Sequence, residues 1–512
     1  MKTSLTRRQF LKFSAISLSP LALGRQHPST LAAARPAKGN RPNIIFLMSD
    51  QQRWDCVGRV NPAVKTPALD SLARDGIFFD QATCQGPMCV PSRYSMMLGL
   101  YPSQVGVLTN AMQLPDERLP AAPLPEILRK AGYQTAGFGK THWGAKGCST
   151  RGFETRFIGQ PRNSRLYEDG AVMMSDLNQA GLDRYNAEAK AFGGGEENIA
   201  GYIGCTSKVP EKDHRDGWVC NQCLGFIDSR LDPERPLFLY LSFIKPHAGH
   251  NVPSGYEELY NINEMPIPEQ PPIEKVEPCH ATGTNREKMY RTFWSKADKT
   301  QWRQMILRYR ANCSWIDSMF ARVISRLKAK GLLGNSLVIY ASDHGEMLGE
   351  RYYRFNKYCL FESSVRVPII LSGTAVPESL KGTIDHRPAE LLDIMPTVLK
   401  AAGLEADPAK PGKDLLAPPV KSATFCELHT RRERPAYMWR NNDYKLILVM
   451  DKTRTDDGFD PADILAGELY DLKNDPVEWN NLFSDDKYAP VRRRMTAALI
   501  NHLQKYAAQK GA

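Results

Sequence analysis

The chain lacks any apolar run long enough to cross a membrane as a helix. The best candidate, residues 13–23, falls short of the roughly 20 apolar residues that a span needs, and no later segment comes closer. We therefore expect no permanent membrane anchor. Internal repeats are also lacking, which argues against a repeat architecture. With 512 residues and 42% hydrophobic content, the chain can build one large globular domain and a smaller one.

A complete zinc-type cysteine set is missing as well. Cys220 and Cys223 form a single CxxC, and the chain has neither a second CxxC nor a histidine pair at metal spacing. Half a zinc site or a redox pair is the alternative for these two, but structural cysteines are the favoured interpretation. Eleven cysteines are many for a cytoplasmic protein. An oxidising compartment would let some of them other than Cys89 pair, with a connectivity that the sequence does not reveal.

The first 34 residues contain five basic residues and no acidic one. Arg7 and Arg8, ahead of Phe10 and Leu11, resemble a twin-arginine export signal, followed by a weakly apolar stretch and three alanines at 32–34. We expect residues 1–34 to be a signal peptide that uses the twin-arginine export machinery of a bacterium. The mature protein would then be periplasmic or secreted. A merely basic N-terminus is the alternative.

The rest of the chain has only a moderate excess of positive charge. The formal charge of +11 falls to +6 without the basic residues of the N-terminal segment. This bias favours anionic substrates and does not indicate a nucleic-acid binder.

Four short apolar runs predict buried strands, and each run is followed closely by polar residues with chemical potential. The runs are 44–48 before Asp50, 135–138 before Lys140, 237–244 before His247 and 337–340 before Asp343. Helical patterns lie between them, including an apolar face from Ile316 to Leu327 that should end at Gly331. Alternation of helices and buried strands predicts an α/β sheet covered by helices on both faces. Ligands of such sheets bind beyond the carboxyl ends of the strands.

The chain divides into a predicted catalytic domain, 41–410, and a smaller C-terminal α+β subdomain, 423–512. A linker rich in Pro, Gly and Lys separates them, after a predicted helix at 389–402; a last helix is expected at 491–506. Residues 160–230 and 262–285 are expected to be long loops that shape substrate choice.

Residues 89–93 read CVPSR, with Gly99 six residues after the arginine. This stretch resembles the signature of the type I sulfatases, in which a formylglycine-generating enzyme oxidises the cysteine to an aldehyde. The hydrated aldehyde has two hydroxyls, one to attack sulfur and one to expel the bound sulfate. Pro91 suits the first turn of a helix, which would hold residue 89 at a helix N-terminus facing an anion. An ordinary core thiol is the alternative for Cys89.

The resemblance extends over roughly residues 42 to 482. The further motifs, in order, are MSDQQ, GKTHWG, KPHAGHNVP, SDHGEMLGE, KYCLFESSVRVP and ELYDLKNDP. Their order is similar to that of sulfatases in the alkaline phosphatase superfamily. The resemblance implies an alkaline phosphatase-like mixed sheet.

The family's metal site carries over to Asp50, Gln51, Asp343 and His344, together with the modified Cys89. A divalent metal is implied, and its oxygen ligands favour Ca²⁺. Mg²⁺, Mn²⁺ and Zn²⁺ stay open because His344 adds a nitrogen ligand and Gln51 is neutral where many sulfatases have aspartate. Gln51 resembles the branch of choline sulfatases and phosphonate monoester hydrolases. For Asp50 or Asp343 taken alone, an ordinary turn residue at the end of a strand is the more common interpretation.

The family's sulfate-binding cations match Lys140, His142, His247 and Lys357. Donors of this kind hold charge on the nonbridging oxygens while the ester bond breaks. Lys357 or His247 is expected to protonate the leaving alkoxide and His142 to promote breakdown of the intermediate.

Two further residues complete the predicted site. Arg93 is expected to orient residue 89 and balance charge, with a structural salt bridge as the alternative. Asn110 is expected to contact substrate.

Hydrolysis of sulfate esters is therefore the expected activity, on a sulfated small molecule or glycan and with a carbohydrate sulfate favoured. A phosphonate or phosphate ester hydrolase of the same superfamily is the first alternative; the lysine and histidine of GKTHWG argue against it. A noncatalytic protein that binds sulfated glycans is the second, and a binding protein has no use for an oxidisable cysteine beside a full metal set.

Overall fold

The structure is a computed structural model that describes residues 41–144, 147–192, 198–272, 279–280, 285–429, 434–451 and 459–507. The predicted signal peptide lies outside the described residues. Among the helices of the described part, none is long and apolar enough to cross a membrane.

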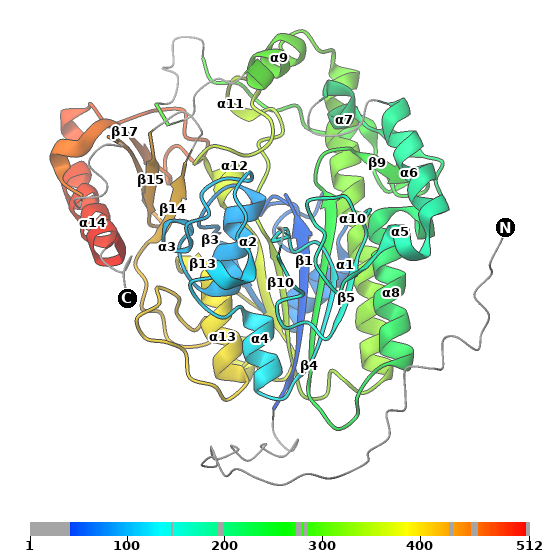
Figure 1. Ribbon diagram of the computed structural model, residues 1–512. Coiled ribbons are helices and arrows are strands. Elements are labelled where there is room, and N and C mark those ends of the chain that lie inside the picture. Colours follow the sequence, from blue (N-terminus) through cyan, green and yellow to red (C-terminus); the bar gives the residue numbers. More distant parts are fainter. Residues whose placement is uncertain are drawn as a thin grey trace, which may run out of the picture. The chain divides into compact units, whose positions relative to one another are not determined.

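A nine-stranded mixed sheet forms the centre of the protein (Figure 1). Its order is β12 (Thr383–Asp385), β2 (Gly76–Phe79), β11 (Ile369–Ser372), β10 (Ser336–Ser342), β1 (Asn43–Asp50), β8 (Leu237–Pro246), β4 (Gln134–Gly139), β5 (Thr155–Ile158) and β6 (Val172–Met173). Only β11 runs antiparallel to its neighbours. The four predicted strands are confirmed as β1, β4, β8 and β10, which lie side by side and parallel.

Strand β1 shows why its sequence is an unbroken apolar run. Ile44, Phe46 and Met48 face one hydrophobic core, and Ile45 and Leu47 face the other. All five are completely buried. A strand covered on both faces has no position for a polar side chain until it leaves the sheet.

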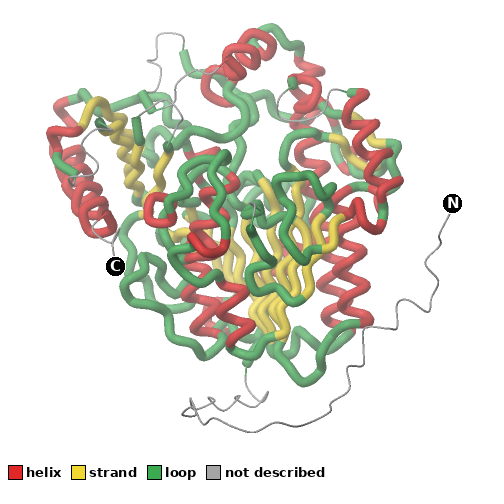
Figure 2. The backbone as a smooth tube through the Cα atoms, viewed as in Figure 1, coloured by secondary structure: helices red, strands yellow, loops and turns green. Residues whose placement is uncertain are grey.

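Helices supply those two cores, as predicted (Figure 2). On one face lie α2 (Cys89–Leu98), α4 (Leu124–Lys130) and α13 (Ile394–Ala401), and on the other lie α1 (Pro67–Arg74), α8 (Arg215–Ser229) and α10 (Lys299–Ala329). Helix α10 contains the predicted apolar face and ends just before Gly331, whose φ of 71° is that of a left-handed C-terminal cap. It begins further upstream than the pattern indicated, at a cap formed by Asp298.

Two of the predicted elements differ in the structure. The segment 389–402 begins as strand β13 (Ala389–Glu390), because it pairs with β3 (Ala82–Thr83), and becomes α-helical only at Ile394. The stretch 160–230 is not one long loop. It contains α5 (Met174–Leu177), α6 (Gln179–Ala191) and α7 (Ile199–Ile203), and α8 packs its apolar side on the central sheet.

A separate antiparallel sheet forms the C-terminal part, as the predicted α+β subdomain requires. It consists of β14 (Thr424–Leu428), β15 (Ala436–Arg440), β16 (Tyr444–Met450) and β17 (Ile464–Asp471), with α14 (Ala489–Ala507) on one face. The other face, including Met438 and Ile447, joins the same core as α2. The boundaries 41–410 and 423–512 stay predictions.

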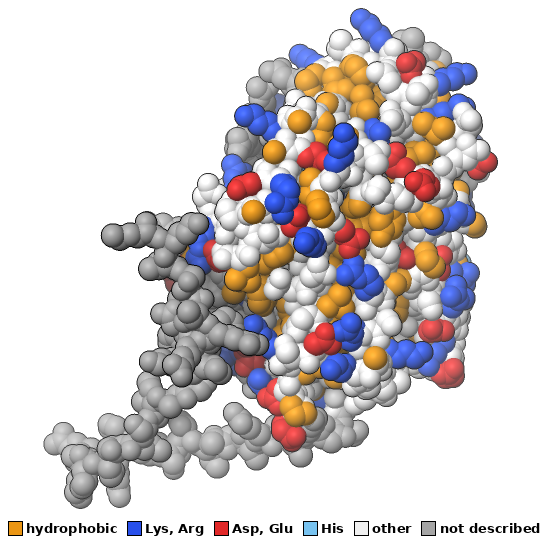
Figure 3. Space-filling model, turned by 90° about the vertical axis from the view of Figure 1, so that its right-hand side faces the viewer, with side chains coloured by type: hydrophobic (Ala, Val, Ile, Leu, Met, Phe, Trp, Pro, Cys, Tyr) orange, Lys and Arg blue, Asp and Glu red, His pale blue; other side chains and the backbone are white. Residues whose placement is uncertain are grey.

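Several smaller elements complete the described part of the chain. They are α3 (Pro102–Val105), β7 (Cys205–Ser207), β9 (Asn251–Pro253), α9 (Asn285–Trp294), α11 (Glu350–Tyr353) and α12 (Glu362–Val365). On the face shown in Figure 3, basic and acidic side chains are interspersed, so the net positive charge is not gathered there.

All eleven cysteines lie in the described part of the chain and none forms a disulfide there, so no pair of the kind that an oxidising compartment would allow is present. Cys220 and Cys223 lie on α8 and are completely buried in the core. They are structural residues, as favoured.

Candidate active site

The predicted site residues meet where four parallel strands end. Asp50 is the last residue of β1, and Asp343 directly follows β10. Ser49 and Ser342 are direct neighbours in the ladder, so the two aspartates leave the sheet side by side. Lys140 directly follows β4 and His247 directly follows β8. This carboxyl edge of the sheet is where the sequence pattern predicts a ligand site.

Helix α2 brings Cys89 to this edge. Cys89 is its first residue and is 1% exposed, with Pro91 in the first turn as predicted. The helix ends at Gly99 with φ of 67°, and a Cβ there would lie 2.6 Å from the Met395 sulfur. The spacing from CVPSR to this glycine therefore sets the length of the helix that presents residue 89.

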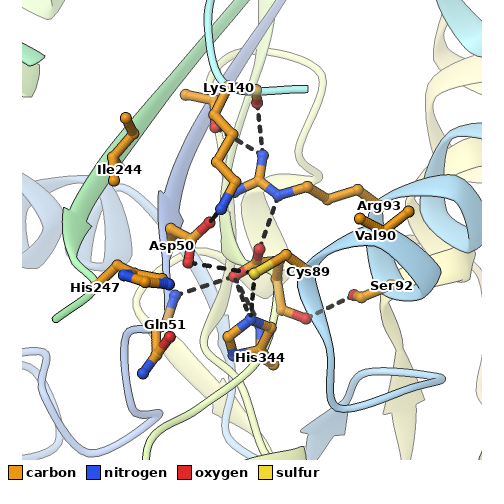
Figure 4. A network of polar contacts seen from close by, with 12 residues as sticks. Asp50, Gln51, Cys89, Val90, Ser92, Arg93, Lys140, Ile244, His247 and His344 are labelled. Carbon is orange, nitrogen blue, oxygen red and sulfur yellow. Dashed lines mark hydrogen bonds and ion pairs between the residues drawn. The ribbon is translucent and has the colours of Figure 1, made fainter. Parts of the chain in front are cut away.

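The buried guanidinium of Arg93 joins the two aspartates (Figure 4). Its Nε donates to Asp343 Oδ2 at 2.7 Å and its Nη2 donates to Asp50 Oδ2 at 3.1 Å. Nη1 donates to the Lys140 carbonyl at 2.6 Å and to Ser242 Oγ at 3.0 Å. Arg93 thus orients the carboxylates and balances their charge. The salt bridge posed as the alternative is therefore present, and the expected role of Arg93 in orienting residue 89 stays a prediction.

Four side chains form a group that could hold a metal ion. Ligand atoms of Asp50, Cys89, Asp343 and His344 all lie within 4.8 Å of one another, and all four residues are buried. Cys89 Sγ is 3.2 Å from His344 Nε2 and 3.8 Å from Asp50 Oδ1. The His344 ring is held by a 3.0 Å contact from Nδ1 to the Gly345 carbonyl, which leaves Nε2 facing the group. Two carboxylates and an imidazole suit a divalent cation.

Gln51, the remaining predicted ligand, lies beside this group. Its φ of 64° turns the chain sharply away from β1, and its backbone N–H donates to Asp343 Oδ1 at 3.0 Å. The carboxamide oxygen Oε1 accepts a hydrogen bond from Lys357 Nζ at 2.6 Å.

The electrostatics of the site favour bound anions. Burial and Cys89 raise the pKa of Asp50, but Lys140 and other nearby cations outweigh them and hold this pKa well below its usual range. Burial likewise opposes the charged form of Lys140, yet Asp50 raises the pKa of the lysine. For Cys89, burial raises the pKa, and Lys140 and Lys357 lower it well below the usual range. These shifts show a strongly positive environment at residue 89.

The other predicted cations lie around residue 89. Lys140 forms a short ion pair with Asp50, and Lys357 Nζ is 3.2 Å from His247 Nε2. His142 adopts a left-handed backbone with φ of 60°. Burial and Lys140 lower the pKa of its imidazole, so it is neutral near pH 7 and able to accept a proton.

The predicted substrate residue Asn110 braces the start of α2. Its Oδ1 accepts from the Val90 backbone N–H at 3.0 Å, and its Nδ2 donates to the Tyr358 hydroxyl at 3.4 Å. Asn110, Tyr358, His142 and His247 are half-buried, whereas the four-residue group is fully buried. Contact of Asn110 with substrate stays a prediction.

Three contacting residues were missed from the sequence. Glu346 and Asn356 hold the Gln51 carboxamide, and Tyr358 contacts Asn110. A signal existed for Glu346, since it lies within the quoted motif SDHGEMLGE three residues after Asp343. Tyr358 likewise lies within a quoted motif, KYCLFESSVRVP, directly after Lys357, whereas Asn356 precedes that motif and no spacing distinguishes it from an ordinary loop residue.

The bridge made by Arg93 generates a prediction about stability. Arg93→Ala would leave two carboxylates buried together, which should lower the free energy of unfolding by about 3–5 kcal/mol. A divalent cation should recover part of the loss, because it can replace the positive charge between them. Denaturant titration with chelator and with Ca²⁺ measures both effects. Arg162→Ala, at an exposed pair with Asp176, is the control and should change stability by about 0.5 kcal/mol or less. Equal stability of the two variants would contradict the assigned role.

Comparison with known proteins agrees with this geometry. The Sulfatase family model matches residues 42–404, and a model of the N-sulphoglucosamine sulphohydrolase C-terminal region matches 349–505. The choline-sulfatase of Rhizobium meliloti is 28% identical over 89% of this chain and 85% of its own length. The N-acetylglucosamine-6-O-sulfatase of Bacteroides thetaiotaomicron is 25% identical over 96% and 94%.

Two solved structures share the fold. The phosphonate monoester hydrolase of Agrobacterium radiobacter aligns with a TM-score of 0.70 at 21% identity, covering 92% of this chain and 96% of its own. A protein solved with its substrate D-glucosamine-2-N,6-O-disulfate aligns with a TM-score of 0.71 at 20% identity, covering 92% and 99%. Both support the predicted alkaline phosphatase-like α/β fold. The chain belongs to the sulfatase family and is a sulfuric ester hydrolase.

Proposed function

We propose that the enzyme hydrolyses sulfate esters of carbohydrates by means of formylglycine at position 89 and one divalent metal ion. The observation that carries this proposal is the position of residue 89. It lies at a helix N-terminus, 3.2–3.8 Å from two residues that could bind a metal, in a buried site whose lysines favour negative charge. A core thiol would have no reason to lie among these groups.

The metal would be held by Asp50, Asp343, His344, Gln51 and residue 89. A divalent cation bound there would polarise a sulfuryl oxygen and lower the pKa of the hydroxyl on residue 89. The two carboxylates favour Ca²⁺ among hard cations, with Mg²⁺, Mn²⁺ and Zn²⁺ as the alternatives that the His344 nitrogen leaves open.

The remaining side chains divide the proton transfers and the charge between them. Lys140 and Arg93 counter the charge of the carboxylates, and Lys140 would hold a nonbridging sulfate oxygen. The Lys357 and His247 nitrogens lie within hydrogen-bonding distance, so one proton can be passed between them and given to the leaving alkoxide. Neutral His142 can accept the proton that must leave the second hydroxyl of residue 89 when sulfate is released.

A carbohydrate sulfate is the proposed substrate class. Relatives with this activity in their names support it, such as the N-acetylglucosamine-6-O-sulfatase. A structural neighbour holds a sulfated glucosamine. Asn110, Tyr358 and the two histidines are each half-buried and could give polar and aromatic contacts of the kind that sugars use.

A phosphonate or phosphate ester hydrolase is the second candidate. The fold similarity to phosphonate monoester hydrolases and the neutral Gln51 favour it. Lys140 and His142, which would supply a cation and a proton acceptor for a singly charged sulfate with a poor leaving group, favour the sulfatase. The third candidate, a noncatalytic glycan-binding protein, conflicts with residue 89 buried among metal-binding and acid-base groups.

Residue 89 should be found in modified form. Mass spectrometry of a tryptic digest of active enzyme should identify the peptide from CVPSR without the sulfur of Cys89. Cys89→Ala should fold normally and lose turnover, because neither hydroxyl of the aldehyde hydrate can form. Cys223→Ala, in a core cysteine away from the site, is the control and should keep its turnover number per folded molecule. Full activity from protein with an intact thiol would refute the formylglycine mechanism.

The proton donor should be revealed by the leaving group. Replacing the donor, Lys357 or His247, by alanine should lower kcat/KM for a sugar sulfate by about 10²–10⁴-fold. The loss should be far smaller for an aryl sulfate, since a phenolate leaves without much help. His142→Ala should slow the hydrolysis of both esters alike, because release of sulfate from residue 89 is a step that both reactions share. The exposed His386 supplies a control variant, His386→Ala, with no expected effect. Equal losses for both esters in the Lys357 and His247 variants would rule out the donor assignment.

We also propose twin-arginine export to the periplasm or beyond. Folded transport suits an enzyme whose cysteine must be modified in the cytoplasm. Replacing Arg7 and Arg8 together by lysine should leave the protein in the cytoplasmic fraction of its host, whereas Lys12→Arg should not. Periplasmic recovery of the double variant would show that another route is used.

A further inference from the structure

Glu346 lies behind the predicted metal ligand Gln51 and is 1% exposed. Its Oε2 accepts hydrogen bonds from Gln51 Nε2 and from the Tyr202 hydroxyl, the latter at 3.2 Å. Its Oε1 accepts from the backbone N–H groups of Leu348, at 3.0 Å, and Asn356. Donors from separate segments therefore fix one buried carboxylate in place.

These contacts allow only one orientation of the Gln51 carboxamide. Nε2 donates to Glu346 and to Asn356 Oδ1, at 3.3 Å for the latter, while Oε1 accepts from Lys357 Nζ. A rotation of the amide by 180° would place its oxygen against two acceptor oxygens and its NH₂ against an ammonium group. The acceptors thus keep Oε1, the atom able to bind a cation, on the side of the catalytic groups.

The same contact explains why residue 51 is an amide in this chain. An aspartate or glutamate at position 51 would bring a second carboxylate against buried Glu346, and like charges without solvent are costly. Gln51 is neutral and removes that conflict. The negative charge that an acidic residue at position 51 would supply is instead on Glu346, which lies behind Gln51. Residues 51 and 346 are therefore matched in charge.

Glu346 also connects Gln51 to Lys357, one of the two candidate proton donors. Its carboxylate accepts the backbone N–H of Asn356, whose own Oδ1 accepts the backbone N–H of Lys357 at 3.0 Å. Asn356 has a left-handed φ of 72°, which asparagine adopts more readily than most other non-glycine residues.

We propose that Glu346 is a positioning residue that aims the Gln51 carboxamide oxygen at the catalytic cation and keeps Lys357 in place. The proposal rests on the metal site of the proposed function. Its direct consequence is on cation affinity, because a misoriented amide would present NH₂ in place of a ligand oxygen.

The test compares Glu346→Gln with the swap Gln51→Glu/Glu346→Gln. In the single variant two amides face each other, so the amide of Gln51 is free to turn over. In the swap, the amide of the new residue 346 can donate to the carboxylate of the new residue 51, which restores the match. Glu350→Gln is the control, because Glu350 lies in the same segment and pairs with Arg53, not Gln51.

Calorimetric titration of chelator-treated protein with Ca²⁺ gives the affinity, and the thermal midpoint without metal reports the fold. Glu346→Gln should weaken Ca²⁺ binding by about 10–100-fold while the metal-free midpoint stays close to wild type. The swap should recover at least half of that loss on a logarithmic scale, and the control should match wild type. Glu346→Asp keeps the charge but withdraws it from Gln51, and should also weaken binding.

The outcomes distinguish failure of the proposed metal site from failure of the role assigned to Glu346. Wild-type protein that binds none of Ca²⁺, Mg²⁺, Mn²⁺ and Zn²⁺ would overturn the proposed metal site and this inference with it. Wild-type binding with unchanged affinity in both Glu346 variants would overturn the inference alone. A swap that folds but binds as weakly as Glu346→Gln would overturn the matched pair.

Discussion

The site depends on one buried ionic interaction, the bridge from Arg93 to Asp50 and Asp343. Two carboxylates at the ends of neighbouring strands would repel each other in a site without solvent. The guanidinium lies between them and donates to both, and its Nη1 donates to the carbonyl of Lys140, directly after β4, and to Ser242 on β8. Arg93 is one turn after Cys89 on α2. The same helix therefore presents residue 89 and holds together the carboxylates that face it.

This arrangement explains how one site can be both negative and positive. The aspartates offer oxygens to a cation, while Lys140 and Lys357 approach residue 89 and lower the pKa of its thiol. A sulfate ester could place one oxygen toward the cation and the others toward the lysines. Charge that develops on these oxygens would meet donors that are already oriented, which is the main source of catalysis in sites of this kind.

Much of the fold and site could be predicted because local patterns decide it. Unbroken apolar runs identify strands buried on both faces, and parallel strands bring their carboxyl ends to one edge. Asp50, Lys140, His247 and Asp343 follow such runs, and the structure brings them together.

The parts that could not be predicted depend on distant contacts. Ala389 is extended because it pairs with β3, and Glu346 acts through Gln51 and Tyr202, which are far away in sequence. The segment that carries Lys357 includes several non-glycine residues with positive φ, such as Arg351, Asn356 and Tyr358. Residue type alone does not predict such conformations, since they persist only when the surrounding structure imposes them.

We propose above that this positive site serves sulfate esters with a divalent metal ion. The most direct test measures kcat/KM of one enzyme preparation, with residue 89 shown to be modified, for a sugar sulfate and a phosphonate monoester. We expect a clearly higher kcat/KM for the sugar sulfate. Lys140→Ala should lower this kcat/KM mainly through kcat, because the lysine acts on charge that develops in the transition state. A preference for the phosphonate, with Lys140→Ala nearly silent, would contradict the proposal.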